Sequence, residues 1–306
     1  MKLKSLLCLG ALVAFCGCDD TRVTISYDLK APVDVELCTQ TYFATYDLEN
    51  EEQMGTITKT FGVLNYSKVG DTIKVKRNYS IDASQGYLKN YMPSELAWRV
   101  KEVNLSAVDR NVTSIEGLSD GYDSLVHSMP MPKRWRDQLL NPDYKPHLVR
   151  AEKHRWEMDH LVVGEVPANA DITQLLKDRG RLNFALIQVD SVVTKGYQNL
   201  DRRKCLWYNV YLHEKESFPY YIWEQHVNSK IVPEKFMAYN TGLSAEYDTE
   251  FGVAIDPTTG IPCQEREVRK GVHTMVNPTT KDTVTFKSHI LSERLYTVKK
   301  PGENEE

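Results

Sequence analysis

The fold is decided by two runs near the N-terminus, Val23-Thr24-Ile25-Ser26-Tyr27-Asp28-Leu29-Lys30 and Val33-Asp34-Val35-Glu36-Leu37, which alternate apolar and polar side chains. Strict alternation places the apolar set on one face of a β-strand and the polar set on the other. Ala31-Pro32 separates the two runs and marks a turn. Thr56 to Val63 and Thr72 to Ile81 repeat the alternation. The four runs therefore predict a small antiparallel β-unit.

Strand signals return in the C-terminal half of the chain. Phe184 to Val193 has the pattern of a buried strand, and Thr283 to Ile290 alternates again. Gly252 to Asp256 and Ile261 to Val268 flank Pro257-Thr258-Thr259-Gly260, which has the composition of a turn. Strands joined by tight turns pair antiparallel, so this half also predicts an antiparallel sheet.

Helix signals are fewer than strand signals. Asp171 has the character of an N-cap and Gly180 that of the residue after a C-cap, which predicts a short helix over 172–177. Regular alternation of strands and helices is absent from the sequence, and this argues against a doubly wound parallel sheet. The predicted fold class is α+β, mainly antiparallel β-sheet with a few short helices.

The domain organisation follows from these signals and from the length of 306 residues, which suggests about two domains. The predicted segments are a signal peptide over 1–17, a small N-terminal β-domain over 18–85, an irregular or helical basic connecting region over 86–160, a C-terminal antiparallel β-domain over 161–300 and a disordered tail over 301–306.

The N-terminus is an export signal. Lys2 and Lys4 form a basic region, and Leu6 to Phe15 is an apolar run that is too short to span a bilayer as a helix. Cys16-Gly17-Cys18-Asp19-Asp20 follows. This arrangement resembles the signal peptide of bacterial lipoproteins, and the resemblance implies that Cys18 becomes the first mature residue and carries lipid such as palmitate. An ordinary secretory peptide, cut near Ala14 or Cys18, is the alternative.

The resemblance also implies a location. The acyl chains would hold an extracytoplasmic protein on a membrane, most simply the bacterial outer membrane. Asp19-Asp20 directly after the cysteine resembles the acidic export signal of surface lipoproteins in the Bacteroidetes-like group, which would put the body on the cell surface. The alternative is that these two acids begin a solvated linker.

Charge and cysteine content exclude several classes of site. The formal net charge is −4, which does not favour a nucleic-acid partner. Neither a phosphate-binding P-loop nor a dinucleotide-binding glycine motif occurs, so we predict no cofactor. A CxxC pair is absent, and we predict no metal site. If Cys18 is lipidated, Cys38, Cys205 and Cys263 allow one disulfide and leave one thiol, and spacing alone cannot assign the pair.

Ser119 is the one candidate nucleophile. Gly117-Leu118-Ser119-Asp120-Gly121 matches the G-x-S-x-G elbow of α/β-hydrolases, in which a strained turn exposes the serine and a later histidine acts as its base. His273 or His289 would complete that order. The alternative is a polar turn bounded by glycines, and the predicted antiparallel sheet favours the turn.

The middle of the chain is locally basic. Residues 133–155 hold seven basic and three acidic side chains, with Trp135 inside the stretch and Trp156 directly after it. Such a stretch could contact an anionic partner, or it could be a surface helix whose long side chains cover apolar neighbours. His154, Glu157 and His160 would share one broad helical face, but this spacing does not match a zinc site, and we interpret it as a charged helix face.

An aromatic segment supplies the candidate binding residues. We predict that Leu206 to His213 and Phe218 to Gln225 form a hairpin around a turn at Glu214 to Ser217. Alternate residues of the first arm would form the core face. The opposite face would carry Trp207, Tyr211, His213 and Tyr220, which could stack sugar rings or contact a protein partner. The alternative is a sheet buried on both sides.

These observations favour a lipid-anchored, non-enzymatic binding or structural module of the bacterial envelope. Its expected partners are the membrane, through the N-terminal lipid, and a glycan or a protein. Two alternatives stay open: an envelope hydrolase that uses Ser119, and a carrier of an apolar ligand inside a curved sheet.

Overall fold

The computed structural model describes residues 21–46, 52–82, 102–117, 127, 133, 136–137, 140, 142, 144–184, 187–218, 242–277 and 279–299. Three predicted site residues, Cys18, Ser119 and Tyr220, lie outside the described residues. Among the helices that the structure describes, none is long and apolar enough to cross a membrane.

Ten strands form one antiparallel sheet. In chain order they are β2 (Val33–Tyr46), β3 (Glu52–Val69), β4 (Thr72–Asp82), β5 (Glu102–Ser106), β6 (Val112–Glu116), β8 (Ile187–Leu200), β9 (Arg203–Phe218), β10 (Gly242–Ile255), β11 (Pro262–Val276) and β12 (Thr283–Val298). Their order across the sheet is β6-β5-β4-β3-β2-β12-β11-β10-β9-β8. The predicted fold class, mainly antiparallel β-sheet with a few short helices, is confirmed.

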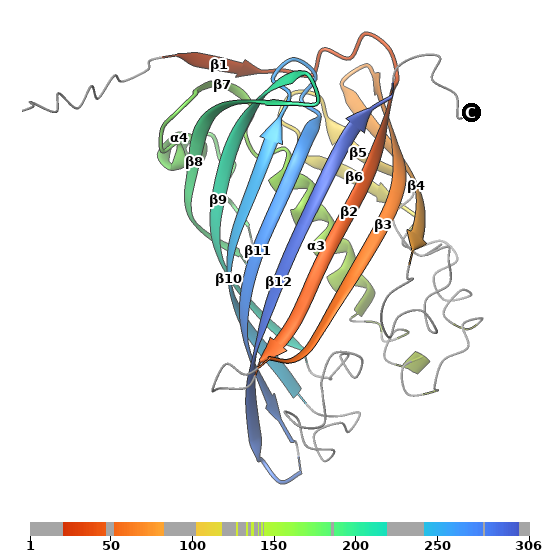
Figure 1. Cartoon of the computed structure of the whole chain (residues 1–306), viewed down its shortest axis with the longest axis vertical. Helices are drawn as coiled ribbons and strands as arrows, with labels where there is room; N and C mark the ends of the chain where they lie inside the picture. The colour runs from red at the N-terminus through yellow and green to blue at the C-terminus, as the bar shows by residue number, and fades with distance from the viewer. Residues whose placement is uncertain are drawn as a thin grey trace, which may run out of the picture.

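The sheet curves around a helix. Helix α3 (Tyr144–Asp159) lies against the concave side, which we call the inner face; the opposite side is the outer face (Figure 1). Three smaller elements lie beside the β8 edge: β1 (Arg22–Ile25), which pairs with β7 (Gly164–Pro167), and helix α4 (Thr173–Asp178). The described sheet is therefore covered on its inner face by segments from the middle of the chain.

Strands from the two ends of the chain meet at the centre of the sheet. β2 pairs with β12 from Val35↔Val298 to Tyr46↔Lys287. This pairing, which we call the seam, joins the meander β2 to β6 to the meander β8 to β12. The sheet is thus continuous across the segment boundaries drawn from the sequence.

Short turns connect most neighbouring strands. Asp201 and Arg202, between β8 and β9, both have positive φ (47° and 60°), as a two-residue hairpin turn requires. The turn at Pro257 to Gly260 lies between β10 and β11, as predicted. Gly260 has φ +66°, and a Cβ there would come within 2.7 Å of the Tyr27 ring. A glycine is needed at this position because the ring packs directly on the turn.

The predicted hairpin at Glu214 to Ser217 is wrong. β9 runs without a break from Arg203 to Phe218, and this segment pairs with β10, with Glu214 opposite Tyr247 and Lys215 opposite Glu246. The Lys215 ammonium lies 2.8 Å from the Glu246 carboxylate. The run of charged residues resembles a turn in the sequence, but Lys215 is paired with Glu246 of β10 and Glu214 with Arg269 of β11, and the strand continues.

Helix α4 lies where the sequence predicts a helix. Asp171 is one residue before the N-cap, Ile172, rather than the cap itself. Its Oδ1 atom accepts hydrogen bonds from the backbone N–H and the hydroxyl of Thr173 (2.8 and 2.6 Å). Gly180 has φ +67° just after the C-cap Arg179, and this confirms its predicted role.

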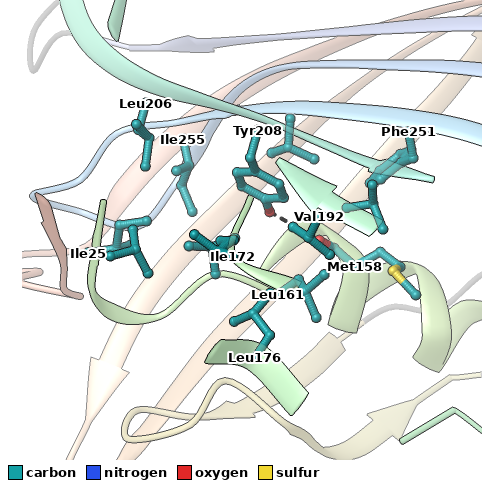
Figure 2. Packing of buried hydrophobic residues seen from close by; sticks show 14 of the residues in the cluster. Ile25, Met158, Leu161, Ile172, Leu176, Val192, Leu206, Tyr208, Phe251 and Ile255 are labelled. Carbon is teal, nitrogen blue, oxygen red and sulfur yellow. Dashed lines mark hydrogen bonds between the residues drawn. The ribbon is translucent and has the colours of Figure 1, made fainter. Parts of the chain in front are cut away.

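The inner face carries two apolar clusters. One, which we call the β9 cluster, packs sheet residues such as Tyr208 and Phe251 against Met158 of α3, Ile172 and Leu176 (Figure 2). The other, which we call the β3 cluster, packs residues of β2 to β5 against a single α3 residue, Trp156. Its fully buried sheet members are Val35, Leu64, Tyr66, Ile73, Val75, Val103 and Leu105.

Candidate functional site

The predicted aromatic residues lie on the outer face. Their neighbours in β9, among them Tyr208 and Val210, point inward and are fully buried, so Trp207, Tyr211 and His213 must point the other way. The His213 Nδ1 atom lies 2.9 Å from the Asp248 carboxylate. The structure thus confirms which side of the first predicted arm belongs to the core, and it brings three of the four candidate residues onto one strand.

Trp207 is packed against its own sheet. A Cβ on Gly252 would lie 2.7 Å from the indole ring, and the indole N–H donates to Asn209 Oδ1 at 2.5 Å. The ring therefore covers the backbone of β10 at Gly252. Cys205 and Cys263 form a disulfide next to it and, with Ala254, make a small buried cluster. Cys38 is the free cysteine among the described residues.

The histidine proposed as a base for Ser119 has another partner. His273 Nε2 lies 2.7 Å from the Ser288 hydroxyl, and its ring stacks on Phe286 with centroids 4.7 Å apart. Burial lowers the pKa of His273 to about 4, and the nearby Arg269 guanidinium contributes a smaller part of the decrease. The ring is therefore neutral at pH 7 and is held by Ser288.

The basic middle segment does not form a simple surface helix. In α3, Glu152 points at β4 and forms an ion pair with Arg77, whose side chain is 3% exposed. The Trp156 indole N–H donates to the same carboxylate at 2.8 Å. Burial raises the pKa of Glu152, but Arg77 and Arg155 lower it more, to about 2. The expected solvated helix face is instead partly turned into the sheet.

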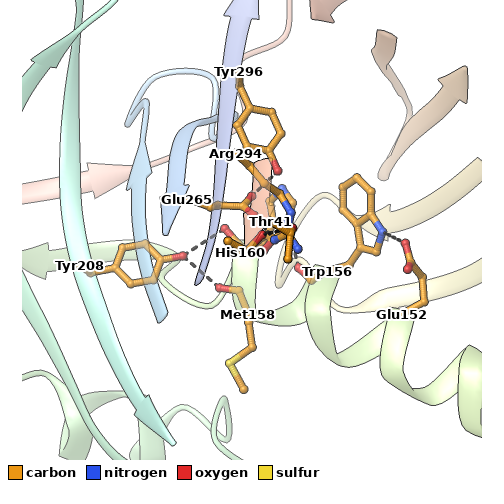
Figure 3. A network of polar contacts seen from close by, with 11 residues as sticks. Thr41, Glu152, Trp156, Met158, His160, Tyr208, Glu265, Arg294 and Tyr296 are labelled. Atoms are coloured by element: carbon orange, nitrogen blue, oxygen red, sulfur yellow. Dashed lines mark hydrogen bonds and ion pairs between the residues drawn. The ribbon is translucent and has the colours of Figure 1, made fainter. Parts of the chain in front are cut away.

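A second ion pair lies on the inner face, on strands β11 and β12. Glu265 is 1% exposed, and its carboxylate accepts from the Arg294 guanidinium at 2.7 Å and from the Tyr296 hydroxyl. Figure 3 shows these three side chains close to the C-terminal end of α3. Together with Arg77, Glu152, Arg155 and Asp159 they form what we call the inner network. Burial raises the pKa of Asp159 well above its ordinary value, and the Glu265 charge adds to the increase.

The end of α3 is anchored by hydrogen bonds from two distant side chains. The Tyr208 hydroxyl donates to the carbonyl oxygens of Met158 and Asp159 (3.1 and 3.0 Å). The Arg181 guanidinium donates to the carbonyl oxygens of His160 and Leu161 (3.0 and 3.3 Å). The last carbonyls of a helix have no partner within the helix, so these bonds satisfy them.

Sequence reasoning missed the inner network. Its members come from β4, α3, β11 and β12, and the sequence between them gives no sign that they meet. The α3 sequence contains charged residues in every turn, which predicts exposure rather than burial. Within the described residues, no cluster of three or more His, Cys, Asp or Glu side chains is arranged to hold a metal ion.

The buried histidines predict a loss of stability in acid. Burial lowers the pKa of His160 to about 4, from an ordinary value of 6.5. Between these two values the unfolded chain binds a proton that the folded protein does not, so the free energy of unfolding decreases as the pH falls through this window. We expect His160 to account for about 2–3 kcal/mol between pH 7 and pH 4.5.

Urea unfolding at both pH values, for the natural chain and for His160→Gln, measures this contribution. The variant should lose less stability on acidification than the natural chain, whereas His213→Gln, on the outer face, should lose as much. Asp159 acts in the opposite direction, because a raised pKa makes its contribution fade as the pH rises, but it is present in all three proteins. An unchanged acid sensitivity in His160→Gln would contradict the assignment.

Comparisons with known proteins give a distant structural likeness. No family model matches the sequence, and no curated protein matches it. Among solved structures, a chain described under lipid–protein interactions in lipovitellin aligns with a TM-score of 0.33 and 8% sequence identity. The alignment covers 90% of this chain and 26% of that chain, so this chain spans about a quarter of the lipovitellin chain. A TM-score this low does not establish a common fold.

Proposed function

We propose that this chain is a lipid-anchored, non-enzymatic binding module of a bacterial envelope, and that the inner face of its sheet holds an apolar ligand. One observation carries the proposal. The inner face has two apolar clusters, and the described contacts of α3 with the sheet include a buried ion pair and hydrogen bonds to the carbonyls at its C-terminal end.

The lining of the inner face suits an apolar molecule. Tyr208, Val210 and Val253 in the β9 cluster and Leu64 and Ile73 in the β3 cluster are at most 1% exposed. Their side chains project from curved strands, so they surround whatever lies against the sheet. Burying an acyl chain there would contribute about 0.8 kcal/mol per methylene group.

The contacts that hold α3 to the sheet suit a site whose ligand enters and leaves. Among the described side chains of this helix, Trp156 and Met158 belong to the two apolar clusters. Ion pairs gain little net free energy when they are buried, because the charges lose their hydration. Moving the Glu152 side of α3 away from β4 would therefore rehydrate Arg77 and Glu152, so a ligand could enter between the helix and the sheet at modest cost.

A crosslink provides the test. In a Cys38→Ser background, cysteines at Arg77 and Glu152 joined by a short cleavable bis-thiol reagent would fix α3 to β4. The matched control joins cysteines at Lys215 and Glu246, another ion-paired couple, on the outer face. Binding is followed through the fluorescence of the uncharged probe N-phenyl-1-naphthylamine. We expect the first crosslink to abolish binding until the reagent is cleaved, and the control crosslink to have no effect.

The outcomes separate two parts of the proposal. If the uncrosslinked protein does not bind the probe and its organic extract contains no lipid, the inner face is not an apolar site. If the protein binds the probe equally well with α3 fixed to β4, binding does not require this side of the helix to move.

The lipid anchor needs its own experiment. Thr21 is only three residues after Cys18, and its carbonyl oxygen accepts a hydrogen bond from the Ala168 N–H at 2.9 Å. A lipidated Cys18 would therefore hold the β1–β7 end of the body close to the membrane. Cells fed a palmitate analogue should label the natural chain and not Cys18→Ala. Equal labelling of both chains would refute the anchor at Cys18, and protease treatment of intact cells would report on which side of the outer membrane the body lies.

A further inference from the structure

Several buried polar groups near the end of α3 have no hydrogen-bond partner among the described residues. They are the Tyr27 and Tyr66 hydroxyls, Arg155 Nε, Asp159 Oδ1 and His160 Nε2. The first two residues are 4% and 0% exposed, and Asp159 and His160 are each 1% exposed. Buried polar groups are rarely left unpaired, because each costs about 1–3 kcal/mol. Several of them in one place need a common explanation.

The unpaired polar groups lie close together in the fold. The rings of Tyr27 and Trp156 both stack on the ring of His160, with centroids 5.8 and 5.7 Å away. Asp159 and Glu265 lie close enough to Tyr66 to affect the pKa of its hydroxyl, and Arg155 and Glu265 likewise affect the pKa of Asp159. We call Tyr27, Tyr66, Arg155 and Asp159 the donor cluster.

The cluster consists mainly of hydrogen-bond donors. Burial raises the pKa of Tyr66 well above its ordinary value, so the phenol keeps its proton. Burial likewise raises the pKa of Asp159 well above its ordinary value, which favours the protonated carboxyl, a hydrogen-bond donor. Arg155 is a cation. His160, beside the donor cluster, contributes an acceptor. Its Nδ1 lies 2.9 Å from the Trp156 carbonyl oxygen and donates a proton to it, so the neutral ring has no proton on Nε2.

The net charge of the inner network also favours an anionic ligand. With the Asp159 carboxyl protonated, as its raised pKa favours, Glu152 and Glu265 oppose three guanidinium groups, Arg77, Arg155 and Arg294. The network then carries a formal charge of about +1, and an uncompensated charge is costly in a protein interior. A bound monoanion would compensate it and would accept hydrogen bonds from the donors.

The position of the donor cluster identifies the kind of anion. Tyr27, Tyr66 and Trp156 are members of the β3 cluster, and Met158, two residues further along α3, belongs to the β9 cluster. An anion held here has apolar side chains on both sides. This environment fits the head group of an amphiphile whose hydrocarbon chain follows the inner face.

We propose that the donor cluster binds the carboxylate of a long-chain carboxylic acid. This inference rests on the proposed function and adds the ligand class. A carboxylate carries the single negative charge that the network lacks, and its two oxygens can accept from two tyrosine hydroxyls and a guanidinium together.

Competition between two ligands of equal length tests the head group. Hexadecanoic acid and hexadecanol are each titrated against N-phenyl-1-naphthylamine bound to the full mature chain. We expect the acid to displace the probe at a concentration at least about tenfold lower than the alcohol, because a charge-assisted hydrogen bond is worth about 1.5–3 kcal/mol. Arg155→Gln should remove this preference and leave displacement by the alcohol unchanged. Phosphatidylglycerol in place of the acid tests whether a phosphodiester monoanion is held instead.

Two tyrosine variants make the test independent of folding. Tyr66→Phe removes a hydroxyl without a partner, so it should not lower the melting temperature of the ligand-free protein, and it should weaken acid binding about fivefold or more. Tyr208→Phe, equally buried, removes the hydroxyl that bonds to the end of α3, and it should lower the melting temperature without changing the preference for the acid.

Equal displacement by acid and alcohol would overturn the carboxylate site and leave the apolar site standing. A stronger effect of phosphatidylglycerol than of the acid would overturn the carboxylate in favour of a phospholipid. A melting temperature that falls as far in Tyr66→Phe as in Tyr208→Phe would show that the Tyr66 hydroxyl is bonded within the protein, and would also overturn the site. Absence of probe binding altogether would instead refute the proposed function.

Discussion

Loss of the Cys205–Cys263 disulfide is expected to lower the free energy of unfolding by about 4 kcal/mol. The bond joins the beginning of β9 to the beginning of β11, and its ends are 58 residues apart in the sequence. A crosslink of this span removes conformational entropy from the unfolded chain, and loop-closure arithmetic gives about 4 kcal/mol at 25 °C. The bond also encloses all of β10, so every unfolded conformation keeps β9 and β11 within reach of each other.

Urea unfolding of the natural chain and of Cys205→Ala/Cys263→Ala measures the effect. Cys38→Ala is the matched control, because Cys38 is free and only partly buried, and its replacement should change stability by less than about 1 kcal/mol. A thiol assay on the denatured, unreduced protein should find Cys38 reactive and the other two cysteines unreactive. Equal stability of the double variant and the natural chain would rule out a structural role for this disulfide.

Replacement of Arg294 by alanine is expected to cost about 3–5 kcal/mol, because it leaves the buried Glu265 carboxylate without its cation. The side chains of Arg294 and Glu265 are 11% and 1% exposed, so water cannot take the place of the guanidinium. Burial lowers the pKa of Arg294, but the neighbouring carboxylate contributes to a net increase, so Arg294 keeps its charge.

A double variant shows whether the cost comes from the unpaired charge. Glu265→Gln/Arg294→Met removes both charges at similar volume and should be more stable than Arg294→Ala. Lys215→Ala breaks an ion pair of similar length on the exposed outer face and should cost less than about 1 kcal/mol. If Arg294→Ala is as stable as the double variant, the Glu265 carboxylate is not isolated in the way that the structure indicates.

Local patterns in the sequence were enough to predict many of the strands, but not β5 and β6, which lie in the stretch predicted to be irregular or helical. Alternation depends on neighbouring residues only, and it correctly assigned Leu206, Tyr208, Val210 and Leu212 to the core. It failed at Glu214 to Ser217, because the charges there are matched by residues of β10 and β11, which are remote in the sequence. Arg269 of β11, for example, lies 2.5 Å from Glu214.

The candidate site could not be predicted from the sequence either, because its members come from segments that are far apart in the chain. A residue such as Arg155 or Asp159 carries a charge, and a sequence pattern assigns charges to the surface unless a partner is known. The partners Arg77, Glu265 and Arg294 come from distant strands and become neighbours only when the sheet curves around α3. Tyr27 was predicted to lie in a strand and Tyr66 was not, and the absence of a partner for their hydroxyls is a property of the folded molecule.

The seam between β2 and β12 sets the order in which the molecule can fold. Strands within each meander follow one another along the chain and can form hairpins early, but the seam joins residues such as Thr41 and Ser292, which lie 251 positions apart and share a hydrogen bond of 3.0 Å. Closing so long a loop is slow, because its entropy is lost before the contacts form. During synthesis or export from the N-terminus, β2 therefore remains an unpaired edge on one side until the last strand arrives.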